Sequence, residues 1–256
     1  MNQTIIQEVR ETTPLIHHLT NQVVMNFSAN GLLSFGAAPV MAKAEEETAE
    51  MAANANGLLL NIGTLTSQEL PAMINAGKTA NERGIPVVLD PVGVAATPFR
   101  TNAVKRILSD VQPTIIKGNA GELAHLVEIP WETKGVESVG DGNADEIALK
   151  VAETYQSAAI VTGKTDVICI GSEVVHNHTG HPILGKITGA GCLLGSILTA
   201  CLTTNKSIEQ QALTAVQFYG LAAEYAAERP DVNGPGTFLS HFIDALAYDP
   251  AKLERE

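Results

Sequence analysis

Short, continuously apolar runs alternate with amphipathic stretches through much of the chain. Uninterrupted apolar runs that end in Gly, Asn or Asp are typical of strands covered by helices on both faces. The stretches between them carry the apolar spacing of helices that bury one side. Predicted strands lie at residues 57–63, 85–93, 113–119 and 158–170, and predicted helices at 67–83, 99–109, 120–127 and 145–155.

Strands that alternate with helices of this length predict βαβ units and an α/β fold with a mainly parallel sheet. The pattern changes after Lys164, where DVICIG and EVVHNH flank Gly171 and Ser172 and predict a β-hairpin. Residues 189–247 are almost wholly helical in pattern. The sequence has no linker-like tract and no internal repeat, so we expect a single domain over residues 1–256.

Polar residues stand where several of the predicted strands end. Because ligands of open parallel sheets bind at the carboxyl ends of the strands, these residues should meet along one edge. They are Asn61, Gly63, Asp90, Lys117, Asn119, Glu122, Thr162 and Gly163. Their convergence from separate parts of the chain predicts a ligand site.

The net charge of −12 argues against a nucleic-acid-binding protein, since such binding depends on Lys and Arg that neutralise phosphates. The first residues show no basic region followed by an apolar stretch, so we expect no signal peptide. Residues 187–205 are nearly uncharged but contain three glycines, and predict a buried helix rather than a membrane span. Cys169, Cys192 and Cys201 form no disulfide framework. We therefore expect a cytoplasmic protein without nucleic-acid or membrane partners.

The stretch KITGAGCLLGS, residues 186–196, has the composition of an anion-binding turn. Gly189 and Gly191 allow a ligand to approach the backbone closely, and a helix beginning near Ala190 would direct unpaired N–H groups toward it. This predicts an anion hole for a transferring phosphoryl group, although a tight loop into a buried helix needs the same small residues. The region is neither a Walker loop, since GHPILGK lacks the following Ser or Thr, nor a dinucleotide fingerprint, since its third glycine comes one residue late.

Cys192 falls in the first turn of that predicted helix, where the helix dipole lowers the pKa of a thiol. Three roles are open for it: a covalent nucleophile, a base or orienting group for an attacking hydroxyl, or a small buried apolar residue. His176, His178 and His181 lie shortly upstream. A Cys192-dependent hydrolase is therefore an alternative function.

The same histidines, in HNHTGH, also resemble a metal site, because His176 and His178 would share one face of a strand. The segment lacks the Cys, His or carboxylate companions of a closed zinc site, which favours an exposed strand end. His17 and His18 adjoin LTN, and we expect them in a loop.

Asp90 and Glu122 are carboxylates at strand ends, with Lys117 and Asn119 beside the second. Mg²⁺ takes one or two carboxylates together with substrate phosphates and water. Alone, Asp90 is typical of a turn before a proline, and Glu122 of a first helical turn. Together with Lys117 they favour a site for Mg–ATP.

The segments TNQVVMNFSANGLLSFGAAPVMA, NIGT, VVLDPVG, IIKGNAGE, VTG and HPILGKITGAGC follow one another along the chain. They occur in this order in the hydroxyethylthiazole kinases, which the chain resembles over nearly its whole length. NAGE and the Gly-Ala-Gly turn mark the wider ribokinase-like superfamily, and the first segment marks the thiazole kinase branch. The resemblance implies a ribokinase-like three-layer α/β/α fold. It also implies transfer of the ATP γ-phosphate to the hydroxyethyl group of a thiazole, which salvages a thiamine precursor.

The resemblance further implies roles for individual residues. The implied residues are Met41, Asn21 and Gly63 for the thiazole, Lys117, Thr162 and Asn119 for ATP, Asp90 and Glu122 for Mg²⁺, and Gly189, Ala190, Gly191 and Cys192 for the catalytic turn. Gly189 would also lie against the substrate hydroxyl. Cys192 stands where the wider superfamily has an Asp base, and the thiazole branch also tends to carry Cys there.

The resemblance also implies a homotrimer whose active sites lie near the subunit boundaries, and we expect this assembly here. Alternatives within the superfamily are a hydroxymethylpyrimidine kinase or another small-alcohol kinase. A ligand-binding regulator that has lost catalysis is a third possibility, although Asp90, Lys117 and Glu122 argue against it.

Overall fold

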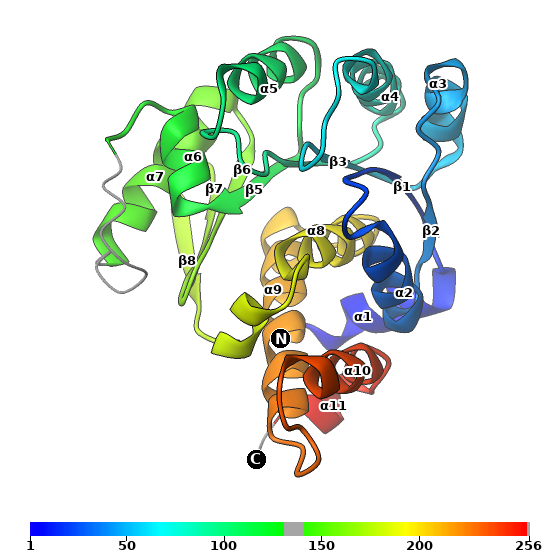
Figure 1. Ribbon diagram of the computed structural model, residues 1–256, viewed down its shortest axis with the longest axis vertical. Helices are drawn as coiled ribbons and strands as arrows, with labels where there is room; N and C mark the ends of the chain where they lie inside the picture. Colours follow the sequence, from blue (N-terminus) through cyan, green and yellow to red (C-terminus); the bar gives the residue numbers. More distant parts are fainter. Residues whose placement is uncertain (131–140, 255–256) are drawn as a thin grey trace.

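A twisted sheet runs through the middle of the protein, between two layers of helices (Figure 1). The computed structural model describes residues 1–130 and 141–254, with the backbone alone for 141–143. Within these residues eight strands lie in the order β2 (Ala38–Val40), β1 (Leu15–Leu19), β3 (Gly57–Asn61), β4 (Val87–Asp90), β5 (Ile115–Asn119), β6 (Ala158–Thr162), β7 (Asp166–Ile170) and β8 (Glu173–Asn177). The strands from β2 to β6 are parallel, β7 runs antiparallel to β6, and β8 runs antiparallel to β7.

The strands predicted from apolar runs are present, with ends that differ by a few residues. The run at 158–170 forms two strands, β6 and β7, which pair antiparallel across a short turn. The predicted hairpin at Gly171 and Ser172 is confirmed, since β7 and β8 pair around it and Gly171 has a φ of 63°. Glycine adopts this left-handed conformation at no steric cost.

The expectation that His17 and His18 lie in a loop is wrong. Both belong to β1 and are fully buried. Each ring has a hydrogen-bond partner that offsets its burial: His17 Nε2 lies 2.7 Å from the Ala42 carbonyl oxygen, and His18 Nε2 lies 3.0 Å from Ser196 Oγ. Polar partners that come from distant residues cannot be recognised in the local sequence, which is why the pattern concealed this strand.

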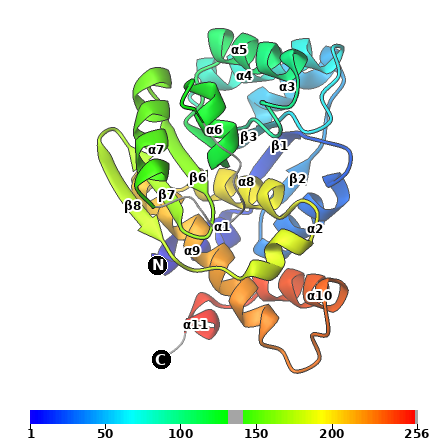
Figure 2. The same ribbon diagram turned by 60° about the vertical axis from the view of Figure 1, so that its left-hand side comes forward.

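Helices cover both faces of the sheet, as Figure 1 and Figure 2 show. One layer contains α3 (Glu45–Asn54), α4 (Glu69–Arg83), α5 (Pro98–Asp110), α6 (Ala120–Leu126) and α7 (Asp141–Tyr155). The other contains α1 (Gln3–Thr12), α2 (Met25–Phe35), α8 (Ala190–Cys201), α9 (Ile208–Ala227), α10 (Pro235–Leu246) and α11 (Pro250–Leu253). A short 3₁₀ helix, η1, spans Pro182–Lys186.

Neighbouring residues of one strand enter different cores. Leu58 and Leu60 of β3 belong to the core beneath α3–α7, whereas Leu59 belongs to the core beneath α8 and α9. Alternate side chains of a strand point to opposite faces, so a strand covered on both sides is apolar at every position. The continuous apolar runs of the sequence therefore arise from the three-layer α/β/α arrangement, which confirms the predicted fold class.

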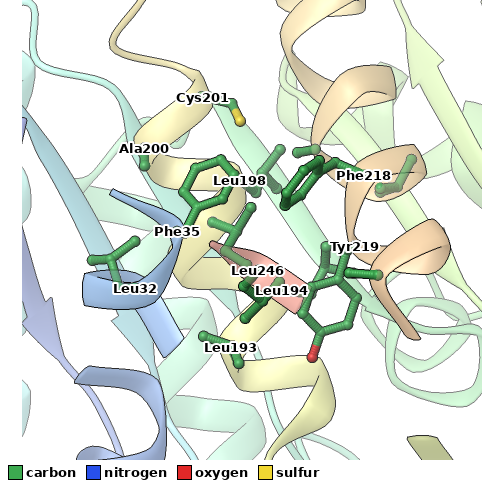
Figure 3. Packing of buried hydrophobic residues seen from close by; sticks show 14 of the residues in the cluster. Leu32, Phe35, Leu193, Leu194, Leu198, Ala200, Cys201, Phe218, Tyr219 and Leu246 are labelled. Atoms are coloured by element: carbon green, nitrogen blue, oxygen red, sulfur yellow. The ribbon is translucent and has the colours of Figure 1, made fainter. Parts of the chain in front are cut away.

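Helix α8 is buried along nearly its whole length and carries the functional turn at its start. Its Leu193, Leu194 and Leu198 pack among aromatic side chains of α2 and α9 (Figure 3). Gly195 brings the helix against the sheet, since a Cβ there would lie 3.2 Å from Leu59. This close packing fixes the first turn of α8 at the carboxyl edge of β3 and β4. No helix of the described residues is long and apolar enough to cross a membrane.

Candidate active site

The site lies where the strand order of the sheet reverses. After β1 the chain passes to β2 on one side, and then returns to β3 on the other side of β1. The loops that leave β1 and β3 therefore separate at their carboxyl ends, and such crevices are the usual ligand sites of open α/β sheets. Asn21 follows β1, Asn61 ends β3, and the first turn of α8 faces both.

The turn before α8 requires glycine at position 189. Gly189 is the N-cap residue and has a φ of 90°. A Cβ at this position would come within 2.4 Å of Val24 Cγ1 and within 3.2 Å of Phe27. No side chain caps the helix, so the N–H groups of its first turn remain available to a ligand. The predicted helix start at Ala190 is confirmed.

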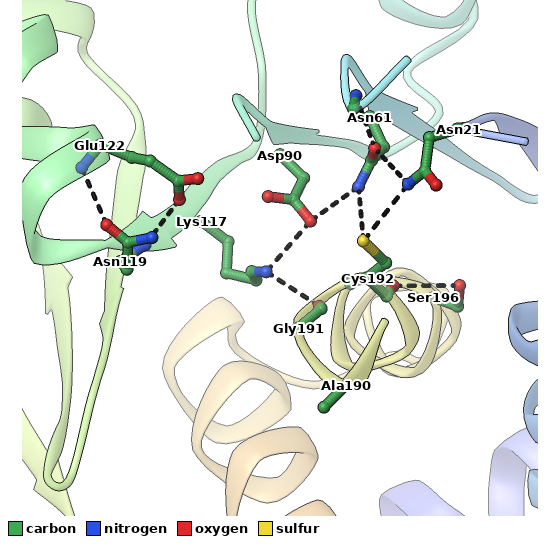
Figure 4. A network of polar contacts seen from close by, with 12 residues as sticks. Asn21, Asn61, Asp90, Lys117, Asn119, Glu122, Ala190, Gly191, Cys192 and Ser196 are labelled. Atoms are coloured by element: carbon green, nitrogen blue, oxygen red, sulfur yellow. Dashed lines mark hydrogen bonds and ion pairs between the residues drawn. The ribbon is translucent and has the colours of Figure 1, made fainter. Parts of the chain in front are cut away.

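Asn61 is the centre of a buried network that joins the strand ends to Cys192 (Figure 4). Its Oδ1 accepts hydrogen bonds from the backbone N–H of Gly63 and from Asn21 Nδ2, each at 3.0 Å. Its Nδ2 donates to Asp90 Oδ2 at 2.9 Å and to Cys192 Sγ at 3.2 Å. Because the Gly63 N–H can only donate, it determines which way the Asn61 amide faces.

Cys192 is surrounded by amides and not by histidine. Asn21 Nδ2 also donates to its sulfur, at 3.4 Å. Burial, together with the nearby charge of Asp90, raises the pKa of the Cys192 thiol, and the opposing effects of Lys117 and the two amides do not offset this. The expectation that the helix terminus lowers this pKa is therefore wrong. Cys192 is a neutral thiol at neutral pH, and none of its hydrogen bonds in the described structure involves a histidine, which argues against a cysteine hydrolase.

Asp90 and Lys117 form a buried ion pair beside this network. Lys117 Nζ lies 3.1 Å from Asp90 Oδ2, and the two side chains are 3% and 2% exposed. Burial raises the pKa of Asp90. Burial alone would lower the pKa of Lys117, but the charge of Asp90, its hydrogen bond to Lys117 and the charge of Glu122 outweigh this and raise that pKa. Lys117 is therefore an ammonium group, and its Nζ also donates to the Gly191 carbonyl in α8 at 2.9 Å.

Glu122 and Asn119 form a capping box at the start of α6. The two Glu122 carboxylate oxygens accept the backbone N–H groups of Gly93 at 2.8 Å and of Asn119 at 2.9 Å. These bonds hold the carboxylate of α6 against the loop after β4, near enough to Asp90 for its charge to raise the pKa of Asp90. The predicted pairing of Asp90 and Glu122 at one edge is consistent with this arrangement.

The donor chemistry of Asp90 and Glu122 fits a hard divalent cation. Within the described part of the chain, no three His, Cys, Asp or Glu side chains form a closed metal site. Two carboxylates with no third protein ligand are what Mg²⁺ uses when phosphates and water complete its coordination.

Met41 and Thr162 lie at the same edge of the sheet but outside the network. Met41 directly follows β2, whose Val40 pairs with His17 of β1, and it is half-buried. Thr162 ends β6 beside Asn119 of β5. The two residues thus stand on either side of the Cys192 network.

The histidines near β8 form a separate surface group. His176 Nε2 lies 2.8 Å from Asp145 Oδ1, and His178 Nδ1 lies 3.3 Å from Thr165 Oγ1. The two imidazole rings are stacked, with centroids 6.4 Å apart. His176 belongs to β8, whereas His178 lies just beyond its end. Neither contacts Cys192 through a hydrogen bond that the structure describes.

Two residues of the site carry no recognisable sequence signal. Tyr219 of α9 donates its hydroxyl to the Ala190 carbonyl at 2.6 Å. Arg100 of α5 donates to the carbonyls of Ile62 at 2.9 Å and Val92 at 2.8 Å, and also to that of Gly63. Arg100 thereby ties together the loops after β3 and β4. Both residues lie inside helical patterns, and their partners become apparent only in the folded chain.

A model of the hydroxyethylthiazole kinase family matches residues 6–250. The chain is 62% identical, over 253 residues, to hydroxyethylthiazole kinase 1 of Oceanobacillus iheyensis, which covers 99% of this chain and 98% of that protein. The structure is similar to that of the hydroxyethylthiazole kinase protein from Pyrococcus horikoshii, with a TM-score of 0.87 and 38% identity, covering 95% of this chain and 91% of that one. A ribokinase-like superfamily protein from Enterococcus faecalis has the same fold, with a TM-score of 0.69 at 14% identity, over 99% of this chain and 95% of that one.

Proposed function

The chain belongs to the hydroxyethylthiazole kinase family, and on that premise we propose how its residues transfer the γ-phosphate of ATP to the hydroxyl of 4-methyl-5-(2-hydroxyethyl)thiazole. The product is the thiazole phosphate used in thiamine salvage. The observation that carries the mechanism is the uncapped first turn of α8, Gly189–Cys192, directly beside the Asp90–Lys117 ion pair.

The turn acts as the anion hole of the reaction. In phosphoryl transfer, charge is spread over the oxygens of the phosphoryl group, and catalysis consists mainly of positioning and electrostatic stabilisation. Free N–H groups of Ala190, Gly191 and Cys192 at the positive end of α8 supply both. Gly189 lets the substrate hydroxyl approach the backbone, since no side chain stands there.

Cys192 orients the attacking hydroxyl rather than forming a covalent intermediate. Its sulfur accepts two amide N–H groups, so it is held as an acceptor toward the crevice. Because its pKa is raised, the thiol is a poor general base at neutral pH. A loose transition state tolerates this, because the hydroxyl proton need not be removed early.

Asp90 and Glu122 would hold the Mg²⁺ that accompanies ATP. When bound, the cation would neutralise part of the negative charge of the ATP phosphates. Lys117 adds a fixed positive charge on the side of ATP, and Thr162 and Asn119, at neighbouring strand ends, contact the nucleotide.

The thiazole occupies the crevice between the loops after β1, β2 and β3. Met41 provides an apolar contact, and Asn21 and Gly63 line the floor, where the Gly63 N–H is already bound to Asn61. Gly63 must be small here, since a Cβ would come within 2.7 Å of Asn21.

The chain acts as one catalytic unit within a homotrimer whose sites lie near the subunit boundaries. In support, Val23 is 68% exposed and Leu33 is 58% exposed, and both lie in the segment that adjoins the site. Among the described residues these two are the most exposed of the large hydrophobic side chains, and a subunit contact over them would remove that apolar surface from water. Its use of ATP and its unpaired cysteines favour a cytoplasmic location.

A coupled assay of ADP formation with a panel of alcohols tests the substrate. We expect turnover with Mg–ATP and the hydroxyethylthiazole, and far less with hydroxymethylpyrimidine. Faster turnover of the pyrimidine alcohol would refute the substrate but keep the kinase class. Tight thiazole binding without ADP formation would refute the kinase class itself in favour of a regulator.

A further inference from the structure

Two buried side chains hold the first two carbonyls of α8 from different sides. Tyr219 of α9 donates its hydroxyl to the Ala190 carbonyl at 2.6 Å, and Lys117 of β5 donates Nζ to the Gly191 carbonyl at 2.9 Å. Figure 3 shows the Tyr219 hydroxyl directed toward the beginning of α8, and Figure 4 shows Lys117 approaching the same turn from the sheet. Lys117 also pairs with Asp90 beside the proposed ATP site, whereas Tyr219 reaches the site only through the Ala190 carbonyl.

A hydrogen bond to a helical carbonyl also determines the direction of the next N–H. The Ala190 carbonyl and the Gly191 N–H belong to one planar trans peptide, in which they point in opposite directions. Holding the Ala190 oxygen therefore aims the Gly191 N–H. A donor on the oxygen also polarises the peptide, which makes its N–H a stronger donor.

The hydroxyl of Tyr219 is itself held in place. The ring is 4% exposed and packs edge-to-face on Phe242, with centroids 5.0 Å apart. Burial raises the pKa of Tyr219 well above its ordinary value, so the hydroxyl remains a donor throughout the working range. A rigid, permanently protonated donor is suited to fixing one peptide of the anion hole.

We propose that Tyr219 is a positioning residue for phosphoryl transfer, which holds and polarises the Ala190–Gly191 peptide so that its N–H faces the transferring phosphoryl group. This rests on the proposed kinase function of the turn. Tyr219 is buried and its hydroxyl is directed to a backbone carbonyl, so it acts through that peptide. Its effect should therefore fall on the rate of the chemical step and not on binding.

Tyr219→Phe removes only the hydroxyl, and Tyr155→Phe is its matched control. Tyr155 likewise donates to a backbone carbonyl, that of Leu126 at 2.9 Å, but in the opposite helical layer. We expect Tyr219→Phe to lower kcat by about tenfold, with the KM of each substrate changed by less than about twofold. Tyr155→Phe should leave kcat unchanged, although both variants lose one hydrogen bond and some stability in urea.

An independent reading comes from the amide of Gly191, observed by ¹H–¹⁵N NMR in the wild type and in Tyr219→Phe. Its resonance should move in the variant, while amides remote from α8 stay in place. Equal kcat for the two variants, or an unmoved Gly191 amide, would overturn the proposal. If the wild type makes no thiazole phosphate, the proposed function fails instead, and a moved Gly191 amide still reports the peptide contact.

Discussion

Cys192 and Asp90 share a single hydrogen-bond donor, the Nδ2 of Asn61, which lies 3.2 Å from the sulfur and 2.9 Å from the carboxylate. A residue at the end of β3 therefore links the thiol of the anion-hole turn to the buried ion pair of β4 and β5. Removing the Asn61 amide should therefore affect both Cys192 and Asp90. Each would lose a hydrogen-bond donor at a buried position where water has little access to replace it.

Asn61→Leu removes this shared donor at nearly constant volume. The Asp90 carboxylate and the Cys192 sulfur would each lose an N–H, and hydrogen bonds to charged groups contribute about 1.5–3 kcal/mol. We expect kcat to fall by about 10- to 100-fold. Asn81→Leu is the control, since the Asn81 side chain likewise hydrogen-bonds within the fold, through two bonds to Gln112, but away from the site. A steady-state kcat that falls equally in both variants would contradict a catalytic role for the network.

Cys192→Ser tests whether the sulfur forms a covalent bond. A hydroxyl can still accept the amides of Asn21 and Asn61, so an orienting role predicts a loss of about tenfold or less in kcat. Removal of a covalent nucleophile costs on the order of a million-fold. Initial rates, with Cys201→Ser from the same helix as control, distinguish the two. Loss of all measurable turnover in the Cys192 variant alone would restore the nucleophile hypothesis.

Asp90→Asn separates stability from catalysis in the buried pair. Removing one partner leaves the Lys117 ammonium uncompensated, which destabilises a protein by about 3–5 kcal/mol. The double variant Asp90→Asn, Lys117→Met should regain most of that stability in urea unfolding, because no charge is left buried. Both the single and the double variant should keep a low kcat, since both lack Asp90, the proposed magnesium ligand. Recovery of turnover in the double variant would show that Asp90 serves only to balance Lys117.

The sheet was predictable where its strands are apolar on both faces. The runs that become β3, β4, β5 and β6 consist of residues whose burial needs no partner, so the local pattern is sufficient. β1 was missed because His17 and His18 occupy its centre, and their acceptors, Ala42 and Ser196, come from other elements.

The turn at Gly189 was predictable for a related reason, since a glycine pair before an apolar helix permits a tight, left-handed backbone turn without any distant partner. The strand-end residues Asn61, Asp90 and Lys117 followed from the sheet-edge rule, and they do meet. The contacts of Tyr219 and Arg100 could not be predicted, because the sequence around a donor within a helix does not indicate which distant carbonyl its side chain reaches. The pKa of Cys192 was predicted in the wrong direction, since the helix dipole is local but burial depends on the whole fold.

Acid should destabilise the protein through the buried His18. Burial lowers its pKa from 6.5 to about 4. The stability that neutral His18 contributes is therefore fully present above pH 6.5 and is lost as the pH falls toward about 4. Within this interval the unfolded chain binds a proton at His18 and the folded chain does not. The shift corresponds to about 3 kcal/mol. His17, whose pKa is also lowered by burial, adds to the same slope.

His18→Gln should make the free energy of unfolding depend less steeply on pH, because the unfolded chain then binds one proton fewer. Urea midpoints measured between pH 6.5 and about 4 would give the slopes of the wild type and the variant. His241→Gln is a control, because His241 lies at the surface and pairs with Asp231. Equal slopes for wild type and His18→Gln would show that His18 does not remain neutral in the fold.

The most direct test of the account is a ³¹P NMR record of the reaction with Mg–ATP and 4-methyl-5-(2-hydroxyethyl)thiazole. A phosphoryl group transferred to the primary alcohol becomes bonded through oxygen to a CH₂ group, so its resonance should be a triplet. We predict that this triplet grows in step with ADP and that inorganic phosphate stays constant. ADP that accumulates with inorganic phosphate and no triplet would contradict the assignment, because the phosphoryl group would then have gone to water.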